Sequence, residues 1–352
     1  MSLLPKTMKQ WVLASRPVGV VKHDDFALQR ADVPNISENE VLLKTLYLGV
    51  APVMQRYMSN QTTFERPMSL GDVMLGRGVG QVVASNNVNY SVGEIVQCKL
   101  GWREYSVIDD DPYYLPFKMT HTDLPLSYGI SSLAMSGFTA LLGMRDICLA
   151  KPGDRTLISG AAGGVGSQVG FIAKALGCSP VVGIAGGPEK CRLLTERLGY
   201  DIAIDYKNDN IDEQLEKYFP DGIDVFFDNV GGELLDIVLG RIRRRARIAV
   251  CGRISEYLLD PKDYHRHRNI YRLGLQDAKM EAFFIFDYFD NYEEYENTIA
   301  DLIRRGDFNP LEDILHGIET MPQALIGLYE GANCGIRMVK VCDNNTAKPA
   351  RG

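Results

Sequence analysis

Short apolar segments alternate with amphipathic segments through the second half of this chain. The apolar segments are hydrophobic on nearly every residue, which is typical of strands buried on both faces of a parallel sheet. In the segments between them the apolar residues have helical spacing, as Val169, Ile172 and Ala173 show within 165–176. The expected strands are 156–159, 181–184, 202–204, 225–227, 248–250 and 282–285, and the expected helices are 165–176, 189–198, 211–218 and 234–242. The alternation predicts an α/β domain, a doubly wound parallel sheet of the Rossmann type.

The first 130 residues follow a different pattern. Short apolar runs such as 41–43, 80–83 and 94–96 are separated by glycine, proline and asparagine. This spacing predicts a compact barrel or sheet, without helical crossovers. The pattern changes near residue 131, and the tail from about residue 309 has one more expected helix at 321–329 and a strand at 337–341.

Composition excludes several classes of protein. The net charge of −7 argues against binding to nucleic acid or to an anionic membrane. No stretch of about 18 apolar residues could span a bilayer, and the first residues lack the apolar core of a secretory signal. The seven cysteines are scattered and none forms a Cys-x-x-Cys pair, which argues against a disulfide framework and a structural zinc site. We therefore expect a cytoplasmic protein.

A glycine-rich loop, Gly160-Ala-Ala-Gly-Gly-Val-Gly166, joins the first expected strand of the parallel sheet to its helix. Glycines at such a junction let the backbone approach a pyrophosphate and leave the helix N-terminal amides free to bind it. A plain tight turn is the alternative, but the strand–turn–helix context favours dinucleotide binding. Ala161 stands where the usual fingerprint begins with glycine, so a slightly wider turn is expected there.

The end of the next strand indicates which dinucleotide binds. NAD-binding units carry an acidic residue about 20 residues beyond the loop, where it accepts the ribose hydroxyls. Gly186 occupies that position here, and Lys190 follows at the start of a helix. An uncharged strand end next to a cation favours the 2′-phosphate of NADPH. The alternative is that Lys190 is an ordinary solvated helix lysine.

Five stretches carry a resemblance to a known family: Trp11–Pro17, Ala161–Gly166, Ala185–Arg192, Phe227–Gly232 and Cys251–Tyr257. With them the chain resembles, along nearly its whole length, the NADPH-dependent alkenal/alkenone double-bond reductases. This family of zinc-independent medium-chain dehydrogenases/reductases includes prostaglandin reductases (leukotriene B4 12-hydroxydehydrogenases) and curcumin reductases. The resemblance implies an NADP-dependent oxidoreductase that delivers hydride to the β-carbon of an α,β-unsaturated aldehyde or ketone. It also implies a Rossmann NADP-binding domain, 131–308, inserted in a GroES-like β-barrel substrate domain formed by 1–130 and 309–352.

The resemblance also assigns site residues. Gly163 to Gly166 would hold the pyrophosphate, and Lys190 and Tyr206 would bracket the 2′-phosphate. The other cofactor-binding positions that it implies are Asn229, Cys251, Gly252, Ile254, Ser255, Tyr257, Phe283, Phe284, Ile285 and Asn333. Tyr257 would be the catalytic hydrogen-bond donor to the substrate oxygen, the alternative being that it only packs against the cofactor. No metal is expected to take part, and we expect a homodimer.

Two departures from the family bear on the substrate. The usual Asp-Pro-Tyr-Met-Arg is Ala51-Pro-Val-Met-Gln55 here, so Val53 replaces an aromatic residue, and the loop at 258–268 replaces a proline-rich one. A quinone oxidoreductase of the same superfamily is the rival enzyme. A non-catalytic NADPH-binding module is the rival from another class, favoured only by Val53.

Three other motifs are expected to be incidental. Tyr114 and Lys118 have the Tyr-x-x-x-Lys spacing of another dehydrogenase class, but Pro116 would break the helix that this pair requires. His265 and His267 have no obvious third metal ligand nearby, which favours a basic surface loop. The arginine run at 241–247 is expected to form a solvated face at a helix–strand junction.

Overall fold

The computed structural model describes residues 4–59, 65–257 and 259–343, and it divides into two compact units. The first unit contains residues 1–130, 314–332 and 337–352, and the second contains 131–313 and 333–336. The second unit thus includes five residues past position 308, the end of the Rossmann domain that the family resemblance implies. It also takes back a short stretch of the tail, 333–336.

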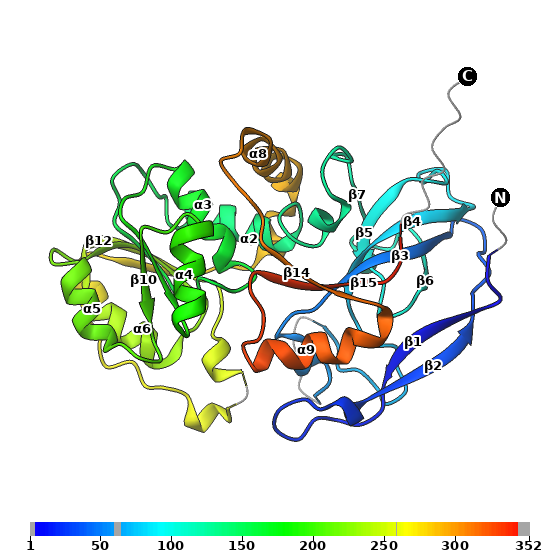
Figure 1. Cartoon of the computed structure of the whole chain (residues 1–352), viewed down its shortest axis with the longest axis horizontal. Helices are drawn as coiled ribbons and strands as arrows, with labels where there is room; N and C mark the ends of the chain where they lie inside the picture. The colour runs from blue at the N-terminus through cyan, green and yellow to red at the C-terminus, as the bar shows by residue number, and fades with distance from the viewer. Residues whose placement is uncertain (1–3, 60–64, 258, 344–352) are drawn as a thin grey trace. The chain divides into compact units, whose positions relative to one another are not determined.

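The second unit is built on a six-stranded sheet (Figure 1). Its strands are β8 (Thr156–Ile158), β9 (Val181–Ala185), β10 (Ile202–Asp205), β11 (Ile223–Asp228), β12 (Ile242–Val250) and β13 (Lys279–Ala282). They lie in the order β10-β9-β8-β11-β12-β13, and every adjacent pair is parallel. This is the strand order of dinucleotide-binding domains, and it confirms the Rossmann fold. The order reverses between β8 and β11, so the loops after these two strands flank the crevice where ligands of such sheets bind.

The helices of this unit are α2 (Met135–Leu142), α3 (Gly166–Ala175), α4 (Pro188–Arg197), α5 (Ile211–Tyr218), α6 (Gly232–Leu239), α7 (Arg272–Leu275) and α8 (Tyr292–Arg305). α3 is buried from Gly166 to Ala173, because it packs on the sheet and on α2. Leu157, Ile184 and Phe226 from the sheet form one core cluster with Leu215 of α5 and Leu239 of α6. The sequence pattern located these crossover helices to within a few residues, because each has a single continuous apolar face.

Two strands differ from the sequence expectation, and α8 was not expected at all. The last strand, β13, covers 279–282 rather than 282–285, so Phe283 and Phe284 follow its carboxyl end and Ile285 begins a 3-10 helix. β12 begins already at Ile242, so most of the arginine run lies within a strand rather than at a helix–strand junction.

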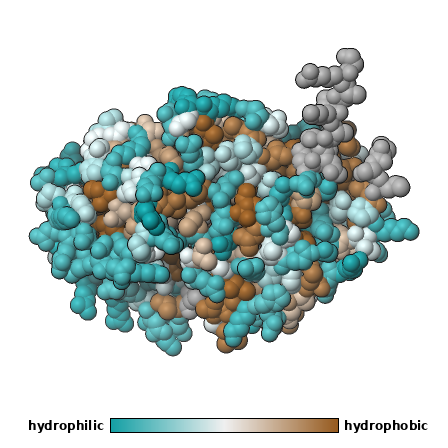
Figure 2. All heavy atoms as spheres, viewed as in Figure 1, coloured by the Kyte–Doolittle hydropathy of each residue, from teal (hydrophilic) through white to brown (hydrophobic). Residues whose placement is uncertain are grey.

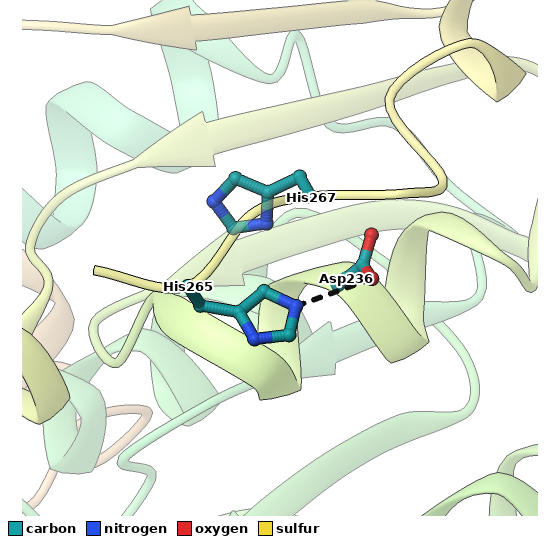
Figure 3. Close-up of side chains that lie close together, drawn as sticks. All are labelled: Asp236, His265 and His267. Atoms are coloured by element: carbon teal, nitrogen blue, oxygen red, sulfur yellow. Dashed lines mark hydrogen bonds and ion pairs between the residues drawn. The ribbon is translucent and has the colours of Figure 1, made fainter. Parts of the chain in front are cut away.

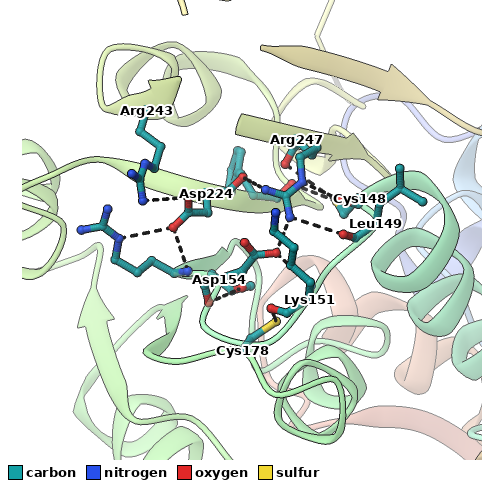
Figure 4. A network of polar contacts seen from close by, with 11 residues as sticks. Cys148, Leu149, Lys151, Asp154, Cys178, Asp224, Arg243 and Arg247 are labelled. Carbon is teal, nitrogen blue, oxygen red and sulfur yellow. Dashed lines mark hydrogen bonds and ion pairs between the residues drawn. The ribbon is translucent and has the colours of Figure 1, made fainter. Parts of the chain in front are cut away.

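Four of the five arginines of this run pair with carboxylates, two of them drawn in Figure 4. Arg243 contacts Asp224 at 3.2 Å, and Arg247 pairs with the buried Asp154 while its Nε donates to the carbonyl of Cys148. Outside this view, Arg241 pairs with Asp212 and Arg245 with Asp277. The expectation of a solvated face is therefore wrong for Arg247, and the run is not a free cationic surface.

The first unit is formed by β-strands and short helices. β1 (Thr7–Leu13) and β2 (Phe26–Asp32) form an antiparallel pair. A second sheet has the order β14-β15-β3-β4-β5-β7, with β6 also paired to β3. Its strands are β3 (Val41–Gly49), β4 (Arg77–Ser85), β5 (Ile95–Lys99), β6 (Tyr105–Ile108), β7 (Phe117–Lys118), β14 (Glu312–His316) and β15 (Ile336–Lys340). This second sheet and the parallel sheet together confirm the expected fold class, a Rossmann domain with a GroES-like β-domain.

The tail packs into the core of the first unit. Met321 and Leu325 of α9 (Met321–Tyr329) share a core cluster with Trp11, whose indole nitrogen donates to the carbonyl of Ile318 at 2.8 Å.

Tyr114 lies in a 3-10 helix and Lys118 in β7, so the Tyr-x-x-x-Lys spacing forms no helical pair.

No helix in the described part of the chain is long and apolar enough to cross a bilayer. The face of the molecule drawn in Figure 2 is mostly hydrophilic.

Candidate functional site

The glycine loop after β8 forms a tight turn. Gly160 adopts a left-handed conformation with φ of 58°, and the amide of Gly163 donates back to its carbonyl at 3.0 Å. Ala161 is fully buried, and its amide donates to the carbonyl of Ile184 on β9. The wider turn expected at Ala161 is therefore not found, because the glycine that makes the turn stands one residue earlier.

The start of α3 presents free donors. The amides of Gly164, Val165 and Gly166 have no hydrogen-bond acceptor among the residues that the structure describes. Tyr200 holds the helix start in place, since its hydroxyl donates to the carbonyl of Gly166 at 2.6 Å. Unpaired amides at the positive end of a helix dipole make a site for an anion such as a pyrophosphate.

Gly166 is required by close packing rather than by its backbone angles. A Cβ at this position would lie 2.3 Å from the carbonyl oxygen of Gly160 and 2.8 Å from the Cα of Ala161. Neither backbone atom can move without opening the turn. The third glycine of the fingerprint therefore brings the helix against the strand end, as dinucleotide-binding loops require.

Replacing Gly166 with alanine should destabilise the fold and weaken dinucleotide binding together. Overpacking a tight contact costs about 1–3 kcal/mol, and here the displaced atoms belong to the binding loop itself. Thermal unfolding and a fluorescence titration with NADPH measure the two effects. Gly274→Ala is the matched control, because a Cβ at Gly274 meets nothing within 4 Å. A Gly166→Ala protein that behaves like this control would contradict the assignment.

The end of β9 is uncharged, and the nearby carboxylate of Asp205 already accepts hydrogen bonds from other groups of the protein. Asp205, at the end of β10, accepts hydrogen bonds from the amides of Gly187 at 2.7 Å and Lys207 at 3.1 Å. Its other oxygen accepts from the side-chain amide of Asn208. Burial opposes ionisation of this carboxyl, but these hydrogen bonds hold its pKa below the usual value. Asp205 thus shapes the loop and offers no free oxygen pair to a ribose.

Cationic and aromatic side chains surround this strand end. Lys190 is half-buried on the first turn of α4. The ring of Tyr206 covers Gly186 so closely that a Cβ there would lie 2.7 Å from Cε1, and Cε of Lys207 would lie 3.0 Å from it. Lys207 is a candidate phosphate contact that sequence reasoning missed. Its only signal in the sequence is that it directly follows Tyr206.

Asp228 organises the loop after β11 on the other side of the crevice. This fully buried carboxylate accepts hydrogen bonds from the Ser159 hydroxyl at 2.7 Å and from the amides of Val230 and Gly231. Burial raises its pKa, although these hydrogen bonds oppose the shift. Asn229 is held as well, since its side-chain amide donates to the carbonyl of Ser159 at 2.8 Å. The loops after β8 and β11 are thereby tied into one rigid edge.

Two glycines let the segment 251–257 lie across this edge. Gly231 has a φ of 70°, and a Cβ on it would lie 2.7 Å from Cβ of Arg253. Gly232 has a φ of 59°, and a Cβ on it would lie 2.8 Å from the Ser255 hydroxyl. The segment is fastened by its own hydrogen bonds, among them Ser255 Oγ to the carbonyl of Val230 at 2.7 Å. The Asp-Asn-Val-Gly-Gly and Cys-Gly-x-Ile-Ser-x-Tyr stretches thus form one structural unit.

Tyr257 ends this segment with its hydroxyl turned back along it. The oxygen lies 3.4 Å from where a Cβ of Gly252 would be, so the phenol lies over the backbone that leaves β12. Burial and the charge of Asp228 raise the pKa of the neighbouring Cys251 thiol to about 12. Cys251 is therefore a neutral thiol, and Tyr257 is the side chain of this segment suited to donate a hydrogen bond.

The remaining predicted residues lie on two other segments. Asn333 is buried, its side-chain amide donates to the carbonyl of Gly335, and Gly335 in turn donates to the carbonyl of Ala162 in the glycine loop. Phe283 packs on Gly143, where a Cβ would lie 3.1 Å from its ring, whereas Phe284 stays 43% exposed.

The cofactor fits the residues present. Apolar side chains from three separate loops are exposed, with Tyr206 at 55%, Ile254 at 39% and Phe284 at 43%. Unpaired amides are present at the start of α3, and the strand end that would select NAD carries no free acid. An extended ligand with phosphates and two flat rings would satisfy both kinds of surface.

One of the two departures from the family lies in each unit. In the first unit, Val53 precedes the short helix α1 (Met54–Tyr57), and the side-chain amide of Gln55 donates to the carbonyl of Gly19. In the second unit, the replaced loop contains a 3-10 turn at Pro261–Asp263, and its first residue, Leu258, lies outside the described residues.

Comparison with known proteins assigns the family. Residues 9–114 match the model described as the N-terminal domain of oxidoreductase, and residues 164–303 match that described as zinc-binding dehydrogenase. The chain is 38% identical to the NADP(+)-dependent 2-alkenal reductase of Nicotiana tabacum over 95% of this chain and 97% of that protein. It is 37% identical to the NADPH-dependent curcumin reductase of Escherichia coli, over 96% and 98%. The crystal structure of CurA from Vibrio vulnificus in complex with NADPH superposes with a TM-score of 0.88, at 37% identity over 95% of this chain and 99% of that one. The chain therefore belongs to the medium-chain dehydrogenases/reductases, in the family of NADPH-dependent alkenal and alkenone double-bond reductases.

Proposed function

We propose that this protein is an NADPH-dependent oxidoreductase that reduces the carbon–carbon double bond of α,β-unsaturated aldehydes and ketones. The observation that carries the proposal is the full-length similarity to alkenal and curcumin reductases, together with a crevice that fits NADPH. Gly163 to Gly166 hold the pyrophosphate, and Lys190 holds the 2′-phosphate between Tyr206 and Lys207. Bound NADPH supplies a hydride.

The residues of the chain supply what the hydride transfer needs around it. Addition of hydride to the β-carbon of an enone places negative charge on the carbonyl oxygen, which a positioned donor must stabilise. Tyr257 Oη donates that hydrogen bond, since a phenol is protonated at neutral pH. The segment 251–257 is held to the loop after β11 by Ser255 and Ile254, so the donor is positioned before substrate arrives. The α-carbon then takes its proton from solvent or through the phenol.

A substrate panel tests the proposal directly. Purified protein is mixed with NADPH and a 2-alkenal, a cyclic enone or a quinone, and the loss of NADPH absorbance is followed. We expect turnover of the alkenals or cyclic enones that exceeds turnover of quinones, with the saturated carbonyl compound as product. Quinone turnover alone would favour the rival quinone oxidoreductase. NADPH binding without oxidation by any substrate would favour a non-catalytic NADPH-binding module, the reading to which Val53 lends weight.

The reaction is proposed to be independent of zinc. A catalytic zinc ion needs three side-chain ligands with one open position, and zinc-dependent relatives add a four-cysteine lobe. The seven cysteines of this chain form no Cys-x-x-Cys pair, and burial keeps the Cys251 thiol protonated.

Dialysis against a strong chelator should therefore leave kcat for an enone unchanged. The measurement compares turnover before and after dialysis, with a zinc-dependent alcohol dehydrogenase treated in parallel as the positive control. A loss of turnover that added zinc restores would contradict this expectation.

We further propose that the protein is a cytoplasmic homodimer. β13 is an edge strand of the parallel sheet, and an edge strand can pair with the same strand of a second copy. Sedimentation equilibrium measures the mass in solution, and a monomer at micromolar concentration would contradict the proposal.

A further inference from the structure

Two histidines and one aspartate that the proposed reaction does not use meet in the second unit (Figure 3). Asp236 lies on α6, while His265 and His267 lie on the extended segment that follows the 3-10 turn Pro261–Asp263. Nε2 of His265 is 3.2 Å from Oδ2 of Asp236, and one ligand atom from each of the three residues lies within 4.8 Å of the others. The third ligand that the sequence did not reveal is thus Asp236, 29 positions before His265.

The orientation of these groups is set by their neighbours. Oδ1 of Asp236 accepts a hydrogen bond from the amide of Asn269 at 2.7 Å, which directs Oδ2 to His265. The two imidazole rings lie 5.4 Å apart, centre to centre, in an edge-to-face arrangement. Only 10% of the Asp236 side chain and 32% of the His265 side chain are accessible to solvent.

One ring nitrogen in this cluster lacks a partner. Nδ1 of His267 is buried and has no hydrogen-bond acceptor or donor among the residues that the structure describes. A buried polar atom without a partner carries a free-energy cost, so native structures rarely leave one. A ligand between His267 and its two neighbours would remove that cost.

We propose that Asp236, His265 and His267 form a binding site for a divalent transition-metal ion of the zinc type. Two imidazoles and one carboxylate suit zinc, cobalt and nickel, whereas calcium and magnesium prefer all-oxygen sites. Ligand atoms in a tetrahedral zinc site lie about 3.4 Å apart, so the pair His265–Asp236, at 3.2 Å, already has the required spacing. Rotation of the His267 side chain would close the remaining distance, and water would take the fourth position.

The site would fasten a loop to the cofactor edge. The loop already makes two contacts with the segment 251–257: the His265 amide donates to Glu256 at 3.0 Å, and Arg253 lies 4.6 Å above the ring of Tyr264. A metal ion would add a link from the same loop to α6. Its role would be to stabilise this loop, so it takes no part in the hydride transfer.

Metal binding to untagged protein tests the proposal without any measurement of activity. Calorimetric titration of the chelator-treated protein with Zn²⁺ should show one site per chain, and His265→Asn, His267→Asn or Asp236→Asn should each weaken it by at least about 100-fold. Asp236→Asn keeps an oxygen for the Asn269 amide, so this variant tests the charge and ligand rather than the local fold. His316→Asn, which changes an exposed histidine outside the cluster, is the matched control and should bind like the parent protein.

Cobalt distinguishes this site from binding by the cysteines. Co²⁺ held by nitrogen and oxygen gives visible absorption bands without the strong near-ultraviolet band of a thiolate complex, and the bands should vanish in His265→Asn/His267→Asn. Thermal unfolding without metal shows whether each variant is folded. A folded double variant that binds Zn²⁺ and Co²⁺ as the parent does would overturn the proposal, as would a parent protein with no stoichiometric site.

Discussion

Replacing Tyr257 with phenylalanine should lower kcat for an enone by about a hundredfold, because one hydrogen-bond donor to the developing oxyanion is lost. The ring is retained, so the packing of the segment 251–257 over the edge of the sheet should be preserved. The structure places the phenol over Gly252, at the carboxyl end of β12, where the ligands of such sheets bind. Steady-state kinetics with a saturating enone measure kcat, and an NADPH titration should give an affinity within a few-fold of the parent.

The comparison of kcat with KM decides what Tyr257 does. A donor that acts only in the transition state lowers kcat and kcat/KM together, whereas a packing residue changes cofactor affinity and stability instead. Tyr218→Phe, on helix α5 outside the assigned site, is the matched control and should leave all of these parameters unchanged. If Tyr257→Phe turns over enones at the parent rate with the same KM, the tyrosine is structural and another donor must be sought.

Replacing Lys190 with alanine should weaken NADPH binding by roughly tenfold or more while NADH binding changes little. A charge-assisted contact with a phosphate contributes on the order of 1.5–3 kcal/mol, and the 2′-phosphate is the only group that distinguishes the two dinucleotides. The structure supports this position for the phosphate, since Lys190 lies half-buried on the first turn of α4 and Asp205 is occupied by other donors.

A second lysine variant, Lys207→Ala, provides a comparison for Lys190→Ala. Lys207→Ala should weaken NADPH binding by a smaller factor, because Lys207 is exposed and its charge is more strongly screened. Lys217→Ala on α5 removes the same charge outside the assigned site and serves as the control. Equal losses for NADPH and NADH in Lys190→Ala would show that the lysine supports the fold rather than selecting the cofactor.

The parallel sheet and its binding edge could be predicted from the sequence because their signals are local. A strand buried on both faces must be continuously apolar, and a crossover helix must have one apolar face, so each element is visible in a short window. The glycine loop is local as well: Gly160 makes the turn and Gly166 allows the close contact within seven residues. The one misplaced strand, β13, has the sequence Lys-Met-Glu-Ala at the sheet edge, where half-exposed positions erase the apolar pattern.

The contacts between residues distant in sequence were decided by the tertiary structure alone. Asp205 reaches back to Gly187, Asp228 joins Ser159 to Gly231, and Asp236 meets His265. Each aspartate looks like an ordinary polar residue in its own window, and its partners appear only when parallel strands bring their carboxyl ends to one edge or a loop folds back on a helix. The residues proposed to bind NADPH could therefore be named from the sequence. Which donors pair with the carboxylates that shape the site depends on burial. A buried carboxylate is destabilising unless nearby groups donate hydrogen bonds to it.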